Sequence, residues 1–213
     1  NKMKLSVCLA AYNGERYIEE QIDSIVNQTY KNWELLIRDD KSSDKTLDII
    51  KEYEKKDDRI KVLEDSKANL GFVRNFEELM SNSSNDFLMF SDQDDYWVED
   101  KIEKYIEAIN ELSSKDLEKP LLIHSNSFVC DKELNIKKEK FINDCAKSSE
   151  FDVCFFNYIV QGSTVLINRK LLELSLPFSS NVTVHDRYLH LLAEFLGKRK
   201  FLSQSLMKYR QHE

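Results

Sequence analysis

Short apolar runs alternate with amphipathic segments four times over about the first 110 residues. Leu5, Val7 and Leu9 alternate with polar or small residues, which predicts a strand, and apolar residues then recur at helical spacing from 18 to 26. Further strands are predicted at 33–37, 60–63 and 87–90, and further helices at about 45–53, 73–80 and 102–109, with Ser43 or Asp44 capping the first of these. Strand followed by helix, repeated in this way, is typical of an α/β fold with a Rossmann-like, mostly parallel central sheet flanked by helices.

The second half of the chain is less regular. Strands are predicted at 121–129, 158–167 and 201–209, and a loop or surface hairpin at 132–147. A helix is predicted from about Asp186 to Leu196, because apolar residues share one face and Gly197 follows, the residue type favoured just past a helix end.

Composition narrows the class of protein. With 213 residues, 41% of them hydrophobic, the chain can form one sizeable α/β domain, so we expect a single domain over 1–213. No apolar stretch approaches the ~20 residues of a membrane span, and no signal-peptide region is visible, so we expect a soluble cytoplasmic protein. A net charge of −7 argues against nucleic acid as a partner. The abrupt end at Glu213 is consistent with a chain truncated from a longer protein.

Polar clusters follow three of the predicted strands. Tyr12-Asn13-Gly14 follows the first strand, residues 39–42 follow the second, and the stretch 92–95 follows the fourth. Ligands of open parallel sheets bind beyond the carboxyl ends of the strands. We therefore expect these three clusters to meet at one site.

Asp92, Asp94 and Asp95 form the densest of these clusters. One interpretation is a solvated turn in which Asp95 caps the next helix. The other is a divalent-ion site, because carboxylates spaced Asp-x-Asp offer the oxygen ligands that Mg²⁺ or Mn²⁺ share with substrate phosphates. Placement directly after an apolar strand favours the second interpretation.

Three other candidates are ambiguous on local grounds. Asp40 can end a strand in an ordinary turn, or its carboxylate can accept a hydrogen bond from a pyrimidine base. Asp186 can cap the late helix or serve as a general base at the edge of a cleft. His212 taken alone is typical of a surface histidine.

In combination the motifs resemble glycosyltransferase family 2, whose members are inverting sugar transferases of the GT-A fold, and within it the bacterial rhamnosyltransferase-like enzymes of cell-surface polysaccharide assembly. The resemblance extends over essentially the whole chain. Its motifs are residues 6–14, 20–29, 38–44, 69–71, 91–97, His185-Asp186 and 209–212. Two positions depart from the family pattern: Ala11 stands where many relatives have proline, and Lys41 where glycine or asparagine is common.

The resemblance implies a role for each matching residue. Residues 1–110 would form the nucleotide-binding half and 111–213 the acceptor-binding half. Asp92-x-Asp94 would be the DXD motif, and Asp186 the catalytic base. The remaining implied roles are contacts with the nucleotide sugar for Ala11, Tyr12, Asn13, Asp40, Asn69 and Asp92, metal binding for Asp94 and His212, and the acceptor side for Asp95, Trp97 and Gly162. Two of these keep an alternative: Asp95 can instead serve the turn, and Trp97 can instead pack under the site.

The implied activity is the metal-dependent, inverting transfer of rhamnose or another hexose. The donor would be a UDP- or dTDP-sugar, the cofactor Mn²⁺ or Mg²⁺, and the acceptor a hydroxyl of a lipid-linked or polysaccharide molecule. Peripheral association with the inner face of the membrane is compatible with such acceptors. Two alternatives stay open: a non-catalytic sugar-nucleotide-binding or assembly module, and a sugar nucleotidyltransferase.

Overall fold

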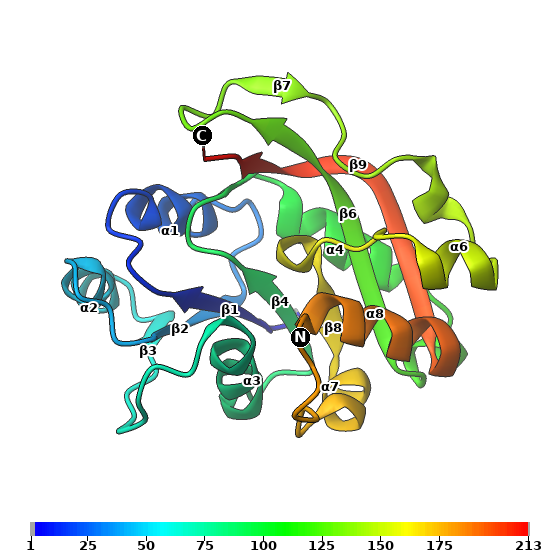
Figure 1. Ribbon diagram of the computed structural model, residues 1–213, viewed down its shortest axis with the longest axis horizontal. Coiled ribbons are helices and arrows are strands. Elements are labelled where there is room, and N and C mark those ends of the chain that lie inside the picture. Colours follow the sequence, from blue (N-terminus) through cyan, green and yellow to red (C-terminus); the bar gives the residue numbers. More distant parts are fainter. Residues whose placement is uncertain (1–2, 213) are drawn as a thin grey trace.

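A computed structural model describes residues 3–212, which form one curled β-sheet with helices on both faces (Figure 1). Within these residues the sheet has nine strands, in the order β3-β2-β1-β4-β8-β6-β9-β5, with β7 paired to β6 at the side. The strands are β1 Leu5–Ala11, β2 Trp33–Asp39, β3 Ile60–Val62, β4 Phe87–Ser91, β5 Tyr96–Trp97, β6 Leu121–Cys130, β7 Ile136–Lys138, β8 Leu166–Asn168 and β9 Lys198–Arg210.

The first four strands are parallel, as the alternating pattern predicts. β1 lies between β2 and β4, and its residue Leu9 stands opposite both Ile37 and Ser91. β3 extends the parallel set beyond β2. The carboxyl ends of β1, β2 and β4, which the three polar clusters follow, therefore lie side by side at one edge of the sheet.

Helices cover both faces of this parallel sheet. The period-2 pattern of β1 sends Leu5, Val7 and Leu9 into one apolar core and Cys8 into the other. Helices α1 (Ile18–Val26), α2 (Thr46–Lys56) and α4 (Lys101–Asn110) pack on the first face and α3 (Phe72–Asn82) on the second. Asp44 supports the start of α2, because its carboxylate accepts the Thr46 N–H at 3.0 Å.

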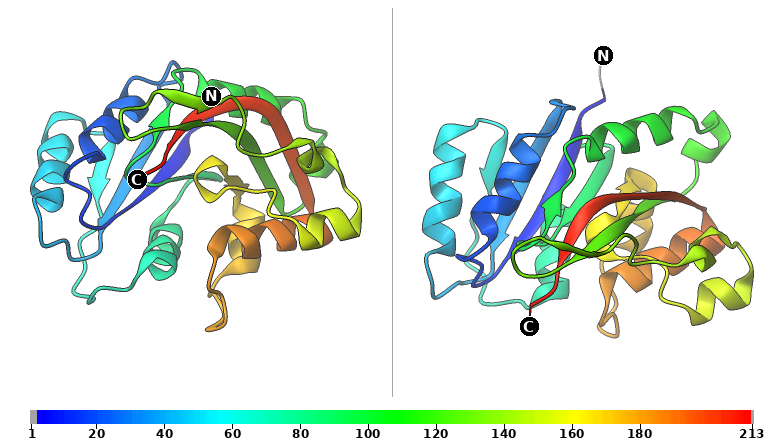
Figure 2. Two further views of the ribbon diagram at one scale, coloured as in Figure 1. Left: turned by 45° about the horizontal axis from the view of Figure 1, so that its top comes forward. Right: turned by 90° about the horizontal axis from the view of Figure 1, so that it is seen from above.

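The second half makes the sheet mixed. β8 runs antiparallel to both β4 and β6, whereas β9 runs parallel to β6 and antiparallel to β5. Figure 2 shows β9 following β6 along its length before its end returns towards the first half of the chain. The predicted surface hairpin is confirmed by β7, which pairs antiparallel with β6.

The strand predicted at 158–167 is wrong for most of its length. Residues 162–164 form a single turn of 3₁₀ helix, η2, and only Leu166–Asn168 pair as a strand. Within the turn, Thr164 folds back on Gln161, whose carbonyl accepts both its N–H and its hydroxyl at 2.9 and 2.7 Å. Apolar residues therefore enter the core here without forming a ladder.

The remaining helices surround the second half. The helix predicted at 186–196 is confirmed as α8, His185–Leu196, and packs against α7 and β9. The shorter segments, which periodicity does not reveal, are α5 Ser114–Leu117, η1 Asp144–Lys147, α6 Phe151–Phe156 and α7 Arg169–Ser175. Among residues 3–212, no helix has the length and apolar character needed to cross a bilayer.

Gly197, where α8 gives way to β9, allows the tightest backbone approach among the glycines. A Cβ atom there would lie 1.9 Å from the carbonyl oxygen of Pro120, which is itself held by the Lys198 N–H at 2.8 Å. We expect Gly197→Ala to lower the free energy of unfolding by about 2 to 3 kcal/mol, because backbone must shift to admit the methyl group. Urea denaturation measures this change.

The neighbouring Leu196→Ala serves as the control. Leu196 is 60% exposed, so its truncation should change the free energy of unfolding by less than about 0.5 kcal/mol. Equal stabilities for the two variants would contradict the predicted clash at Gly197.

Candidate active site

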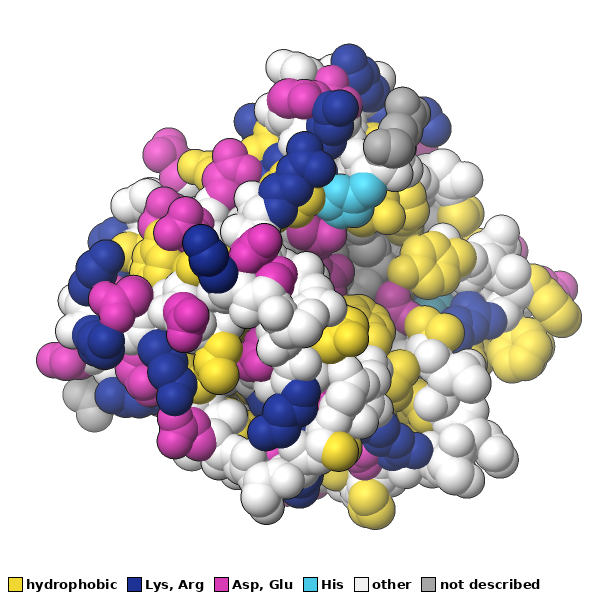
Figure 3. Space-filling model, turned by 60° about the vertical axis from the view of Figure 1, so that its left-hand side comes forward, with side chains coloured by type: hydrophobic (Ala, Val, Ile, Leu, Met, Phe, Trp, Pro, Cys, Tyr) yellow, Lys and Arg dark blue, Asp and Glu magenta, His cyan; other side chains and the backbone are white. Residues whose placement is uncertain are grey.

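The ends of β1, β2 and β4 open into a cleft of about 630 Å³. Figure 3 shows the molecule hollowed in one view, with acidic side chains in the hollow. The cleft is lined by Ala10, Ala11, Tyr12, Asp40, Lys41, Asn69, Gly71, Phe72, Asn75, Asp92, Gln93, Asp94, Tyr209, Arg210 and His212. The structure thus brings the three predicted polar clusters together at one place.

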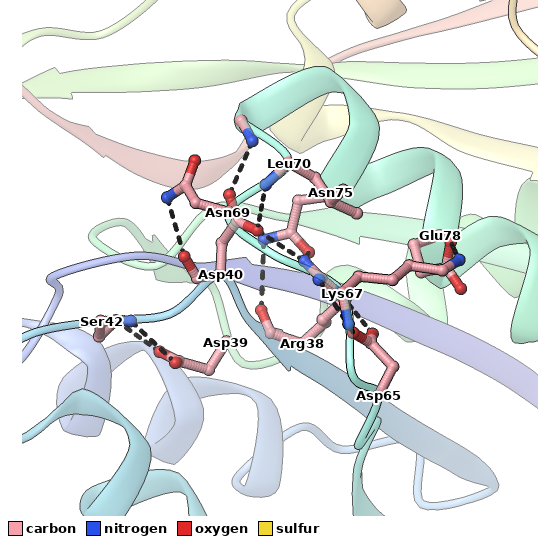
Figure 4. Close-up of polar contacts among 11 residues, drawn as sticks. Arg38, Asp39, Asp40, Ser42, Asp65, Lys67, Asn69, Leu70, Asn75 and Glu78 are labelled. Atoms are coloured by element: carbon pink, nitrogen blue, oxygen red, sulfur yellow. Dashed lines mark hydrogen bonds and ion pairs between the residues drawn. The ribbon is translucent and has the colours of Figure 1, made fainter.

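A buried arginine shapes one wall of the cleft (Figure 4). Arg38 is 1% exposed and donates to Asp40 and to Asp65, each at 2.7 Å. Burial opposes the charge of this guanidinium, but hydrogen bonds and the charges of the two carboxylates raise the pKa of Arg38 above its ordinary value. The arginine therefore stays charged and ties β2 to the chain that follows β3.

Asp40 in turn holds the loop before α3. Its carboxylate accepts the N–H groups of Leu70 and Gly71, both at 2.8 Å, and its backbone carbonyl accepts the side-chain amide of Asn69 at 2.9 Å. Asp40 and Asn69 both line the cleft, and their observed bonds also build its wall. Any ligand contact by Asp40 would be made by a carboxylate already oriented by Arg38.

The turn after β1 is tied to its neighbours by side chains. The Asn13 N–H donates to Ser42 Oγ, and its side-chain oxygen accepts the Ser43 N–H, both at 2.8 Å. Asn13 shapes this turn but is not among the residues that line the cleft, unlike Ala11 and Tyr12. Lys41 has φ 65°, a left-handed backbone that glycine and asparagine adopt readily, which explains why those residues suit this position.

The carboxylates of the 92–95 stretch divide between the cleft and the interior. Asp92 and Asp94 line the cleft, whereas Asp95 is 1% exposed and one of its oxygens lacks a hydrogen-bond partner. Burial, and then the charges of Asp94 and Asp186, raise the pKa of Asp92 to about 7. Burial likewise raises the pKa of Asp95 well above its ordinary value.

A buried lysine faces this acidic group from α4. Lys101 is fully buried, and burial lowers its pKa to about 7 while the charges of Asp95 and Asp92 oppose that change. Its amine lies 3.9 Å from the centre of the Trp97 ring. Sequence reasoning missed Lys101, because a lysine at the start of a helix is usually solvent-exposed.

His212 meets Asp94 across 118 positions of sequence. The His212 Nε2 lies 2.6 Å from a carboxylate oxygen of Asp94, and Tyr17 packs against the imidazole. The buried Arg210 holds the same loop, donating its Nε–H to the Asp94 carbonyl at 2.7 Å and its backbone N–H to Asp95 at 3.1 Å. Arg210 was missed by sequence reasoning although it adjoins His212 in the same motif.

The two predicted metal residues therefore adjoin each other and face the cleft. Residues 3–212 hold no group of three histidine, cysteine or acidic side chains arranged for a metal ion. Asp94 and His212 can supply two ligands, so the remaining positions would fall to water and to the phosphates of a bound substrate, as Mg²⁺ and Mn²⁺ sites commonly allow. The residues fit a shared ion and do not form a closed metal site.

Asp186 lies at the start of α8 and is 6% exposed. One carboxylate oxygen accepts the Tyr158 hydroxyl at 2.7 Å and the Gly162 N–H at 3.0 Å, and the other accepts the Arg187 N–H at 2.6 Å. Asp186 does not line the cleft, but its charge contributes to the raised pKa of Asp92. It therefore lies beside the cleft with an orientation fixed by three donors.

Two predicted acceptor-side residues do not face the cleft. Trp97 is 1% exposed because β5 pairs with β9 and places its indole in the apolar core. Asp95 is equally buried beneath the loop, where it accepts the Arg210 N–H. Of the places open to these two residues, the structure shows Trp97 packed in the core and Asp95 held in the turn, whereas Gly162 contacts Asp186 and its acceptor-side role stays a prediction.

A family model and two related sequences all match this chain to glycosyltransferases. The family model described as Glycosyl transferase family 2 matches residues 6–115. The chain is 30% identical over 170 residues to the putative teichuronic acid biosynthesis glycosyltransferase TuaG of Bacillus subtilis, covering 79% of this chain and 64% of that protein. It is 30% identical over 212 residues to an uncharacterized glycosyltransferase of Haemophilus influenzae, covering 97% of this chain and 76% of the relative.

A third relative and two solved structures extend the comparison. The dTDP-rhamnosyl transferase RfbG of Shigella flexneri is 26% identical over 216 residues, covering 96% of this chain and 72% of RfbG. The crystal structure of S. aureus TarS 1-349 in complex with UDP-GlcNAc superposes with a TM-score of 0.77 at 18% identity, over 99% of this chain and 59% of that one. Mannosyltransferase PcManGT from Pyrobaculum calidifontis, in complex with GDP-Man and Mn²⁺, gives 0.68 at 15% identity, over 93% of this chain and 54% of that one. The chain thus spans less than two thirds of TuaG and of both solved chains, and the two structures confirm the fold.

The raised pKa of Asp92 makes stability depend on pH. Between about pH 4 and 7 the folded protein keeps a proton that an unfolded aspartic acid has lost, so the stability falls as the pH rises through this range. Asp92→Asn removes this titration. Between pH 5 and pH 8, we expect the free energy of unfolding of the variant to rise by about 1 to 2 kcal/mol relative to that of the wild type. This value is smaller than the full pKa change implies, because solvent in the cleft screens the charges.

Urea denaturation at the two pH values, with a chelator present, measures this difference. Asp48→Asn on the exposed surface of α2 is the matched control: it keeps Asp92, so its difference in stability from the wild type should be the same at both pH values. An equal difference between Asp92→Asn and wild type at both pH values would contradict the assignment.

Proposed function

The chain belongs to glycosyltransferase family 2, and we propose that it transfers a sugar from a nucleotide sugar to a hydroxyl group, with inversion at the anomeric carbon. The observation that carries this proposal is the meeting of Asp40, Asp92 and Asp94 in one cleft, with Asp186 held beside it. Asp40, Asp92 and Asp94 are placed to bind a nucleobase, a ribose and a metal-bound diphosphate. Asp186, beside them, is placed to accept a proton.

The nucleotide would occupy the cleft between the β1 turn and the loop before α3. Ala11, Tyr12, Asp40 and Asn69 would contact the base and ribose, and Asp92 the ribose or a metal-bound water. Asn13 would act indirectly through the turn that it holds with Ser42 and Ser43. The cleft volume of about 630 Å³ is in the range of small-molecule sites.

Asp94 and His212 would hold a divalent ion, Mn²⁺ or Mg²⁺, together with the donor diphosphate. Bound there, the ion would neutralise the charge that grows on the leaving nucleoside diphosphate. Arg210 would position the loop for metal binding, because it donates hydrogen bonds to the backbone carbonyl of Asp94 and to the side chain of Asp95.

Asp186 would accept the proton of the attacking hydroxyl. Its hydrogen bonds from Tyr158 and Gly162 fix one carboxylate oxygen, so the orientation of the base is set before an acceptor arrives. A single base and no covalent intermediate are what inversion needs, in contrast to the close carboxylate pair of a retaining glycosidase.

We extend the proposal to donor and acceptor through the relatives. RfbG carries the name of a dTDP-rhamnosyl transferase, and TarS was solved with UDP-GlcNAc. A UDP- or dTDP-linked hexose, rhamnose among them, is therefore the proposed donor, and a polysaccharide or lipid-linked molecule the proposed acceptor. The proposed place of action is the cytoplasm or the inner face of the membrane, in cell-surface glycan synthesis.

Two other functions make different predictions from the same cleft. A sugar nucleotidyltransferase would release pyrophosphate from a nucleoside triphosphate, whereas a glycosyltransferase releases UDP or dTDP. A binding module would bind the nucleotide sugar without turnover. Two product assays separate the three: release of nucleoside diphosphate from UDP-glucose, UDP-GlcNAc or dTDP-rhamnose, with water or added glycans as acceptor, and release of pyrophosphate from UTP or dTTP with a sugar 1-phosphate.

Asp186→Asn tests the proposed base. We expect kcat for nucleoside diphosphate release to fall about 10²- to 10⁴-fold, because the amide cannot take the proton. The affinity for UDP with Mn²⁺, measured by calorimetry, should change less than about threefold, since Asp186 does not line the nucleotide cleft. Turnover at the wild-type rate would remove Asp186 from the mechanism.

Metal removal tests the role of Asp94. EDTA should abolish turnover and Mn²⁺ or Mg²⁺ should restore it, while Asp94→Asn should weaken activation by the metal about tenfold or more. Asp48→Asn supplies the control for loss of a surface carboxylate. Full activity in chelator would overturn the assignment.

A further inference from the structure

Two side chains of α4 reach the turn that holds Asp186. The Lys101 amine donates to the backbone carbonyl of Ser163 at 2.9 Å, and the Tyr105 hydroxyl donates to the carbonyl of Thr164. Both side chains are fully buried, so neither bond competes with water. Lys101 and Tyr105 lie one helical turn apart, and the two carbonyls that they bind are adjacent.

The turn that they grip is in direct contact with the proposed base. Gly162, the first residue of η2, donates its N–H to Asp186 at 3.0 Å, and a Cβ atom at Gly162 would lie 3.3 Å from the same carboxylate. The turn closes on itself through the Val165 N–H, which donates to the Gly162 carbonyl at 3.0 Å. A shift of the turn would therefore move the Gly162 N–H away from the Asp186 carboxylate or push the Gly162 backbone against that carboxylate.

The same end of α4 adjoins the acidic loop. The helix begins at Lys101, six residues after Asp95, and the Lys101 amine interacts with the charges of Asp92 and Asp95. Burying an amine is costly unless it is paired and hydrogen-bonded, and an apolar side chain would fill the space without that cost. The Lys101 amine is bonded to the Ser163 carbonyl at 2.9 Å and lies 3.9 Å from the centre of the Trp97 ring, so it joins the residue just after the acidic loop to the 162–164 turn.

We propose that Lys101 and Tyr105 are positioning residues that fix the 162–164 turn, and through the Gly162 N–H fix the carboxylate of Asp186 relative to the Asp92–Asp95 loop. The inference rests on the proposed function only for its catalytic consequence. The positioning itself is a property of the folded chain. Neither residue lines the cleft, so neither contacts the donor.

Amide hydrogen exchange tests the positioning without any substrate. In Tyr105→Phe and in Lys101→Met, we expect the Gly162 amide to exchange at least about tenfold faster by NMR, since loss of one buried hydrogen bond weakens the local structure. Tyr30→Phe is the matched control: its hydroxyl also donates to a backbone carbonyl, that of Met3, at the opposite end of β1 from the cleft. Unchanged exchange of the Gly162 amide in both α4 variants would overturn the proposal.

Turnover tests the consequence. Tyr105→Phe should lower kcat for nucleoside diphosphate release about tenfold while the KM for the donor stays within about twofold, because misplacement of the base affects chemistry and not donor binding. Lys101→Met should lower kcat by a similar factor. Tyr105→Phe added to Asp186→Asn should lower kcat less than twofold further, whereas general damage to the fold would add its full effect. Faster exchange with unchanged kcat would also overturn the proposal.

The two failures are distinguishable. If wild type releases no nucleoside diphosphate from UDP-glucose, UDP-GlcNAc or dTDP-rhamnose, the proposed function fails, and the exchange measurement still decides whether α4 holds the turn. If wild type is active and Asp186→Asn is not, the function stands, and the α4 variants then decide the inference.

Discussion

The parallel pairing of β1 with β2 on one side and β4 on the other is the constraint on which the site depends. This register puts Leu9 opposite Ile37 and Ser91, so the chain leaves all three strands at the same edge. Polar side chains that follow those strands are excluded from the apolar layers and must find partners in one another, in backbone groups or in a ligand. The cleft follows from this requirement.

The charges around the cleft are balanced unequally. Arg38 is enclosed by Asp40 and Asp65, and each carboxylate has a close partner. Lys101 and Arg210 lie on the inner side of the Asp92–Asp95 loop, while Asp94 meets the imidazole of His212 on its outer side. Burial, and then the charges of Asp94 and Asp186, raise the pKa of Asp92 above its ordinary value. A cation bound in the cleft would lower the repulsion between these neighbouring carboxylates.

The first half of the fold and the place of the site could be predicted from sequence, because period-2 and helical spacing are local properties and strand ends locate ligands in parallel sheets. The second half could not be predicted as well. Trp97 has the same neighbours in sequence whether it faces an acceptor or the core, and only the pairing of β5 with β9, about 110 residues away, decides for the core. The 158–167 segment is apolar enough for a strand, yet its backbone bonds close a 3₁₀ turn. Lys101 looks like a surface lysine until the carbonyl of Ser163 is folded against it.

β9 ties the two halves together, and this has a consequence for synthesis of the protein. Its last residues bring Arg210 and His212 to the loop of Asp94, after the strand has run alongside β6 for most of its length (Figures 1 and 2). A ribosome that has released the parallel strands, the Asp40 wall and the acidic loop has therefore not yet made the groups that clamp that loop. Synthesis from the N-terminus therefore makes the acidic loop well before Arg210 and His212, and contacts of such long sequence separation form slowly.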